Sequence, residues 1–164
     1  MRTTTLLASL ALALASCGGA ADPAGLNSEG YAALGSGNYE AAAGHFQSAL
    51  DALGTNTSDA QYERAMLGLI DANAHVDPDA AQADFLAYAA ASSTLSADEY
   101  GRVGKELANA KAFTQAVAVV DAGIQAHPET PALMTIMEMI SEEAKKSGDT
   151  GALDAMAGLG YLGD

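Results

Sequence analysis

The stretch GNYEAAAGHFQSAL, residues 37–50, decides the fold expected of this chain. Its apolar side chains recur at steps that place them on one face of a helix: they are Tyr39, Ala42, Ala43, Phe46, Ala49 and Leu50. Gly37 has the backbone freedom that a tight turn needs, and Asn38 can cap the helix that follows. The alanines beside Phe46 let a second helix approach closely. The stretch therefore predicts one helix of a packed pair.

The composition favours an all-α domain. Hydrophobic residues make up 49% of the 164 residues, so the chain can bury a core, although alanine and glycine supply much of this fraction. Tryptophan is absent, and there are no runs of β-branched residues bounded by turns, which argues against a sheet. We expect thin helices that pack closely.

The chain is strongly acidic, with a formal net charge of −14. Loss of Arg2 with the leader described below would leave 21 acidic against 6 basic residues, a charge of −15. Nucleic acids and anionic lipid headgroups are bound by clusters of lysine and arginine, and the sequence contains none that fits. We expect no nucleic-acid partner and attribute the acidity to solubility.

The first residues read as a targeting segment. Arg2 gives a positive start, and an apolar run covers residues 6–15. As a helix this run would rise about 15 Å, too little for a bilayer core of roughly 30 Å but right for a secretory signal. The last residues, Leu14-Ala15-Ser16-Cys17, resemble the bacterial lipobox.

That resemblance implies a lipoprotein. Residues 1–16 would be the signal peptide, Cys17 would carry the acyl chains, and residues 17–22 would be a lipidated tether. Gly18 stands where an Asp would favour the inner membrane, so we expect an anchor in the outer membrane that faces the periplasm. The alternative is an ordinary signal peptide that ends near a cysteine.

Caps and breakers divide the rest of the chain into helices. Asp22-Pro23, Asp77-Pro78 and Thr130-Pro131 are typical helix starts. Residues 58–61 and 96–99 read as capping boxes. The predicted helices cover residues 23–34, 39–53, 58–75, 77–93, 96–110, 113–126, 130–146 and 150–157, followed by a glycine-rich tail over 158–164.

The helices also repeat at a regular spacing. Shifts of 39 and then 35 residues align Ala42 with Ala81 and Ala116, and Phe46 with Phe85 and Val120. Residues 23–157 thereby resemble tetratricopeptide (TPR) repeats, best over 23–54 and 97–130. The resemblance implies an α-solenoid of three to four helix pairs. An antiparallel helical bundle is the alternative.

In that family the first helix of each pair lines a concave groove that binds peptides. Here the groove residues would be Asn27, Tyr31, Leu34, Met66, Leu67, Ile70, Asn73, Arg102, Lys105, Asn109, Ile136 and Met139. Arg102 and Lys105 would form a positive island beside apolar residues, which fits a ligand with an apolar segment followed by a carboxylate. The alternative is that the apolar residues complete the core and the bases pair with acids such as Asp98.

No pattern of residues indicates chemistry. His45, His75 and His127 have no acid or second histidine at ligand spacing, so we expect them to be solvated. Nucleophile-elbow and phosphate-loop motifs are absent, and we expect no enzyme, cofactor or metal. We place Met134, Met137 and Ile140 in the core. Tail residues Leu159, Tyr161 and Leu162 either cover the last helix, fray, or dock into a partner.

The resemblance thus implies a lipid-anchored, non-enzymatic module that binds a protein or peptide in the bacterial envelope. A narrower alternative is an assembly factor for an outer-membrane, pilus or secretion complex. A small-ligand carrier, or an enzyme without a recognisable site, is the alternative of a different class.

Overall fold

A computed structural model describes residues 22–92 and 95–162. Within these ranges the chain is all-α, as predicted, and forms no strand. Each predicted helix is present, with ends within a residue or two of the prediction. The helices are α1 (Pro23–Gly35), α2 (Tyr39–Leu53), α3 (Ala60–Val76), α4 (Pro78–Ala91), α5 (Ala97–Asn109), α6 (Phe113–Ala126), α7 (Pro131–Ser147) and α8 (Thr150–Gly158).

The helix starts follow the capping residues with one exception. Ser96 and Glu99 form the predicted capping box, in which the Ser96 backbone N–H donates to Glu99 Oε2 at 2.7 Å. The box predicted over residues 58–61 is wrong. Asp59 is the cap and accepts from the Gln61 backbone N–H at 2.8 Å. Its carboxylate satisfies a first-turn donor, so the helix begins just after it.

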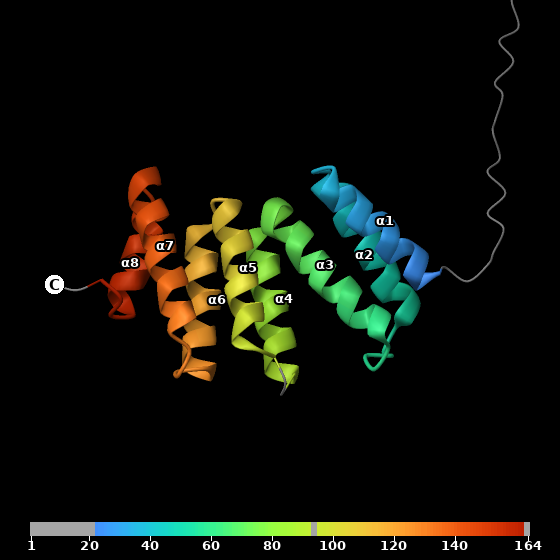
Figure 1. The fold of residues 1–164 in the computed structure, drawn as a ribbon. Helices are drawn as coiled ribbons and strands as arrows, with labels where there is room; N and C mark the ends of the chain where they lie inside the picture. Colours follow the sequence, from blue (N-terminus) through green and yellow to red (C-terminus); the bar gives the residue numbers. More distant parts are fainter. Residues whose placement is uncertain (1–21, 93–94, 163–164) are drawn as a thin grey trace, which may run out of the picture.

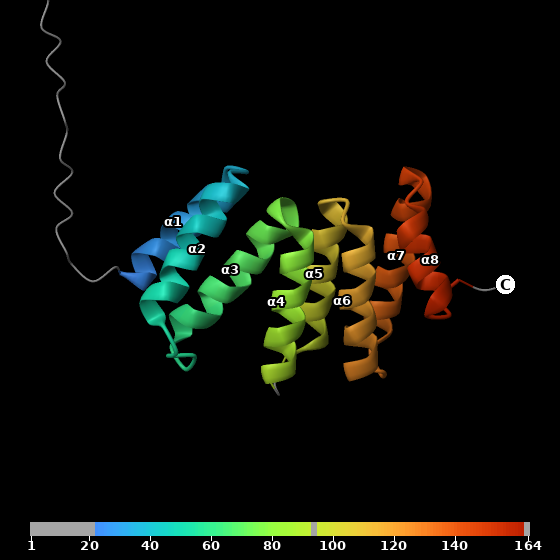
Figure 2. The ribbon, with the colours of Figure 1, turned by 180° about the vertical axis from the view of Figure 1, so that it is seen from behind.

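The helices form a row from α1 and α2 at one end to α7 and α8 at the other (Figures 1 and 2). Along this row α1 contacts α3, α3 contacts α5, and α5 contacts α7. On the other side α4 contacts α6, and α6 contacts α8. Among the described residues, no such extended contact joins α2 to α4. The even-numbered helices therefore form a second row, and this row is interrupted between α2 and α4.

The core follows the same division. A smaller cluster joins α1, α2 and α3 around Phe46, and a larger one runs from α3 to α8. Met66 packs against both clusters. The residues aligned by the sequence spacing all point inward with an exposed fraction of 0%: they are Ala42, Ala81, Ala116, Phe46, Phe85 and Val120. The predicted burial of Phe46 is thus confirmed.

Glycines bring neighbouring helices close around Phe46. A Cβ added at Gly30 in α1 would lie 2.6 Å from the nearest ring atom of Phe46, and one added at Gly68 in α3 would lie 2.4 Å away. Real Cβ atoms do not approach so closely. The Phe46 ring therefore occupies the space left free by two absent side chains, and α1 and α3 both press against it.

Candidate functional site

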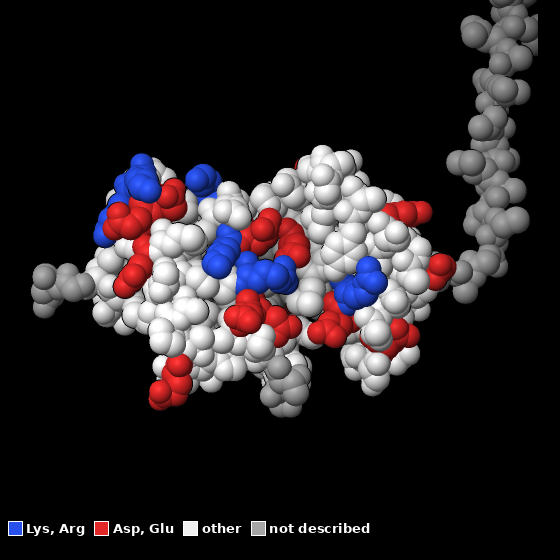
Figure 3. All heavy atoms as spheres, viewed as in Figure 1, with Lys and Arg blue, Asp and Glu red and all other residues white. Residues whose placement is uncertain are grey.

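The predicted groove maps onto the surface made by α1, α3, α5 and α7, which we call the odd-helix face. It faces the viewer in Figures 1 and 3, and lysine and arginine side chains gather near its middle with acidic side chains around them. Several predicted groove residues are exposed or half-buried: Tyr31, Leu34, Met66, Leu67, Asn73, Arg102, Lys105, Asn109 and Met139.

Three predicted groove residues are buried instead, at Asn27, Ile70 and Ile136. Asn27 is 0% exposed, and its amide donates to the backbone and side-chain oxygens of Gln61, each at 3.0 Å. It therefore ties α1 to α3 and is not available to a ligand. Ile70 is 0% exposed in the larger core cluster. Ile136, at 9%, closes one end of a cleft described below.

On α3 the groove prediction is wrong for Met66 and Ile70 because of how that helix is rotated. Arg64, Asp71 and His75 make the contacts to α1 and α5, and they share one side of α3 at steps of seven and four residues. At 3.6 residues per turn, Met66 and Ile70 lie on roughly the opposite side. Met66 lines a cleft between α3 and α4.

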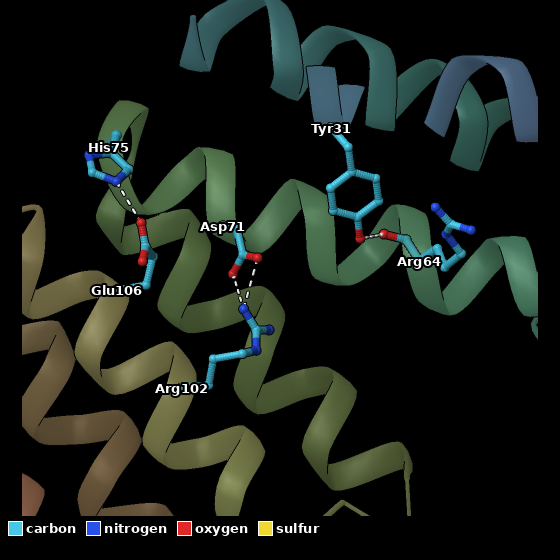
Figure 4. A network of polar contacts seen from close by, with 6 residues as sticks. All are labelled: Tyr31, Arg64, Asp71, His75, Arg102 and Glu106. Atoms are coloured by element: carbon cyan, nitrogen blue, oxygen red, sulfur yellow. Dashed lines mark hydrogen bonds and ion pairs between the residues drawn. The ribbon is translucent and has the colours of Figure 1, made fainter. Parts of the chain in front are cut away.

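Tyr31 anchors the α1 end of the odd-helix face (Figure 4). Its hydroxyl donates to the Arg64 backbone carbonyl at 3.0 Å, and the Arg64 guanidinium lies 5.5 Å from the centre of its ring. The ring meets Phe46 edge to face at 4.9 Å between centroids. Burial, followed by the nearby Asp71 charge, raises the pKa of Tyr31. Tyr31 keeps 36% of its surface exposed, so a ligand could still reach it.

An ion pair neutralises half of the predicted positive island. Arg102 Nη1 in α5 donates to both carboxylate oxygens of Asp71 in α3, at 2.6 and 2.8 Å (Figure 4). Burial raises the pKa of Asp71, and the Arg102 charge opposes this shift. The expected alternative, in which a base pairs with a nearby acid, holds for Arg102, with Asp71 in place of Asp98.

The histidines are not simply solvated, and that prediction is wrong. The His75 ring lies 2.8 Å from Glu106 in α5 and stacks on Tyr39 with 3.8 Å between ring centroids. His127 lies 3.0 Å from the Leu95 carbonyl oxygen, and His45 lies 3.2 Å from Glu29. The partners come from other helices or loops, so spacing along one helix could not show them.

A sequence signal for this network did exist. Asp71 and His75 stand four residues apart on α3, and Arg102 and Glu106 stand four apart on α5. The two pairs have the same spacing and complementary charges. Two adjacent helices in register can therefore join Asp71 to Arg102 and His75 to Glu106. The predictions from sequence placed Arg102 in the groove and expected His75 to be solvated, and they assigned no role to Asp71 or Glu106.

A cleft of about 400 Å³ lies between α5 and α7, and we call it the α5–α7 cleft. Leu133 and Ile136 supply apolar walls. The charged residues that line the cleft from α5 are two bases, Arg102 and Lys105, and two acids, Asp98 and Glu106. Gly101 makes room for Ile136, since a Cβ there would lie 2.6 Å from Ile136 Cδ1. Within the described part of the chain the Lys105 ammonium has no hydrogen bond or ion pair. The positive island is thus reduced to one unpaired lysine.

The end of the chain covers the last helices. Tyr161 and Leu162 pack against the larger core cluster, and the Tyr161 hydroxyl donates to Asp121 in α6 at 2.7 Å. Burial and this hydrogen bond raise the pKa of Tyr161 to about 12. Met137 and Ile140 are buried as predicted, whereas Met134 is 42% exposed and lines a cleft of about 660 Å³ near Tyr161. The core prediction for Met134 is therefore wrong.

In residues 22–92 and 95–162, no group of three or more His, Cys, Asp or Glu side chains could hold a metal ion. None of the helices described combines the length and hydropathy that a membrane span requires. Cys17 and the leader lie outside the described residues. No protein-family model, curated protein or solved structure matches the chain.

Proposed function

We propose that this chain is a lipid-anchored, non-enzymatic module that binds a protein or peptide segment in the bacterial envelope. In this proposal its helix pairs form a TPR-like solenoid, and the odd-helix face receives the ligand. The row of helices, each in contact with its neighbours along the row, supports the solenoid. The leader that ends in Cys17 supports the anchor.

The observation that carries the binding role is the α5–α7 cleft. Lys105 stands there without a counter-ion among the described residues, on a chain with a net charge of −14. Apolar walls from Leu133 and Ile136 lie beside it. A segment that ends its apolar part with a carboxylate would satisfy both the lysine and the walls, because a desolvated carboxylate needs a positive partner.

Lys105→Glu is the variant that tests the cleft. Charge reversal at Arg102 would be ambiguous, since the new glutamate would face Asp71 and repel it. The wild-type protein should capture a set of envelope proteins from native membranes, and we expect Lys105→Glu to lose that set. The helical circular dichroism should stay unchanged, because exposed charges contribute little to stability. Lys111→Glu makes the same change in net charge at an exposed lysine outside this cleft that has no ion-pair partner in the described part of the chain, so it should keep that set. Equal capture by all three proteins would remove the α5–α7 cleft from the mechanism.

The anchor has its own test. Cys17→Ser removes the sulfur that would carry the diacylglycerol, so labelling with an alkyne fatty acid should be lost and the product should leave the membrane fraction or remain uncleaved. A Cys17→Ser protein that still takes up label and stays with the membrane would contradict the lipoprotein assignment without touching the binding proposal.

A further inference from the structure

A second cleft, of about 690 Å³, opens between α3 and α4, and we call it the α3–α4 cleft. It lies where the second row of helices is interrupted. The two helices share the larger core near their connecting turn, through Ala74 and Ala81, and then diverge toward the other end (Figures 1 and 2). Since α2 makes no extended contact with α4, no side chains from α2 fill the opening. The cleft is therefore a consequence of the helix arrangement.

The walls of the α3–α4 cleft are apolar and aromatic. Met66 lines the cleft and also packs against both core clusters, and Tyr62 in α3 and Tyr88 in α4 contribute aromatic rings. Short side chains at Ala87 and Ala91 keep the α4 side shallow. The volume is within the usual range for ligand pockets, roughly 300–1,000 Å³. Methionine adapts its shape to a partner, and tyrosine rings attract cations.

The charges around this cleft all have one sign. Asp59, Glu63 and Asp84 line it, and no lysine, arginine or histidine is among its described lining residues. None of the three carboxylates has an ion-pair partner within the described part of the chain. Burial, followed by the charge of Asp77, raises the pKa of Asp84. Burial, followed by neighbouring Glu63, raises the pKa of Tyr88. Both shifts arise first from burial, and the neighbouring carboxylates add to them.

We propose that the α3–α4 cleft is a second binding site, which takes a peptide segment that combines apolar side chains with lysine or arginine. The walls would bury the apolar side chains, and the carboxylates would pair with the cations at the rim. The charge complementarity assigns the occupant, since an acidic or neutral segment would leave all three carboxylates without an ion-pair partner. This site has the opposite charge preference to the α5–α7 cleft, and it stands or falls independently of that cleft.

The test uses the full protein and a short fluorescent peptide of alternating leucine and lysine, with a leucine–glutamate peptide for comparison. We expect saturable binding of the lysine peptide alone, measured by fluorescence anisotropy. The double variant Glu63→Gln/Asp84→Asn should weaken this binding by about fivefold or more, given the usual strength of rim charge pairs. Ala87→Trp should also weaken it, because a large ring fills the cleft while the carboxylates remain.

A matched control separates the cleft from general acidity. Glu129→Gln/Asp154→Asn makes the same change in net charge at exposed residues that do not line the cleft, and its affinity should stay close to wild type. Equal weakening by both double variants would overturn the proposal, as would full affinity in Ala87→Trp with its circular dichroism unchanged. Displacement of the peptide by tetramethylammonium at comparable potency would overturn the peptide assignment and give the cleft to small organic cations.

Discussion

The sharpest prediction concerns the contact between Gly68 and Phe46. In Gly68→Ala the new Cβ would lie 2.4 Å from both Cε1 and Cζ of the Phe46 ring. The ring cannot move away easily, because it is 0% exposed and Gly30 in α1 approaches it as well. Overpacking of this kind costs about 1–3 kcal/mol, and we take the upper end because the clash is severe. Alanine recovers about 1 kcal/mol through helix propensity. We therefore expect a net loss of about 2 kcal/mol.

Gly44→Ala provides the matched control. Gly44 lies within α2, and a Cβ there meets nothing within 4 Å. The same substitution should stabilise the protein by about 0.5–1 kcal/mol, because only the propensity changes. Thermal unfolding followed by circular dichroism should show a midpoint several degrees lower for Gly68→Ala, by about 2–4 °C for each kcal/mol lost, and a slightly higher midpoint for Gly44→Ala.

A double variant identifies the clashing partner. Phe46→Leu removes ring atoms, so its cost combined with Gly68→Ala should be smaller than the sum of the two single costs. A Gly68→Ala protein as stable as Gly44→Ala would refute the close approach of α3 to the Phe46 ring. A strictly additive double variant would show that the loss comes from some other contact.

Three further predictions follow from burial and protonation. Phe46→Ala should cost about 3–5 kcal/mol in unfolding free energy, and an unchanged denaturation midpoint would contradict its burial. Folding raises the pKa of Asp71, so the folded state holds the carboxyl proton more tightly, and the free energy of unfolding falls as pH rises through the folded pKa. In Asp71→Asn this fall should be missing from denaturation curves taken across acidic pH. Tyr161 should ionise near pH 12. Its contribution to stability should persist below about pH 10 and be lost as pH rises through the folded pKa. Tyr161→Phe should remove the last step of phenol ionisation from an ultraviolet titration.

Much of the fold could be predicted from local patterns. Capping residues, prolines and glycines act within a few residues of themselves, so all the helices were found and only their ends were shifted. The inward positions of Phe46, Phe85 and Val120 followed from spacing, because a helix fixes which residues share a face. The Asp59 cap was missed because two adjacent residues, Ser58 and Asp59, could each start the helix.

The candidate site was predicted less well. The odd-helix face was expected, and Tyr31 and Lys105 lie on it as exposed residues. The repeat spacing did not determine the rotation of α3 about its own axis. Because of this rotation Met66 lines the α3–α4 cleft instead of the odd-helix face. From the sequence, Asp98 was named as an acid that could pair with Arg102, and only the packing of α3 against α5 selects Asp71.

The sequence by itself determined the helices, most of their caps and the buried side of α2, α4 and α6, because each depends on residues within one or two turns. The tertiary structure alone decided which charges are neutralised and where the surface is hollow. Arg102 and Asp71 are 31 residues apart, and the α3–α4 cleft exists where α2 and α4 make no extended contact. Such outcomes depend on the crossing angles and rotations of whole helices, which the summed packing of the side chains between them sets.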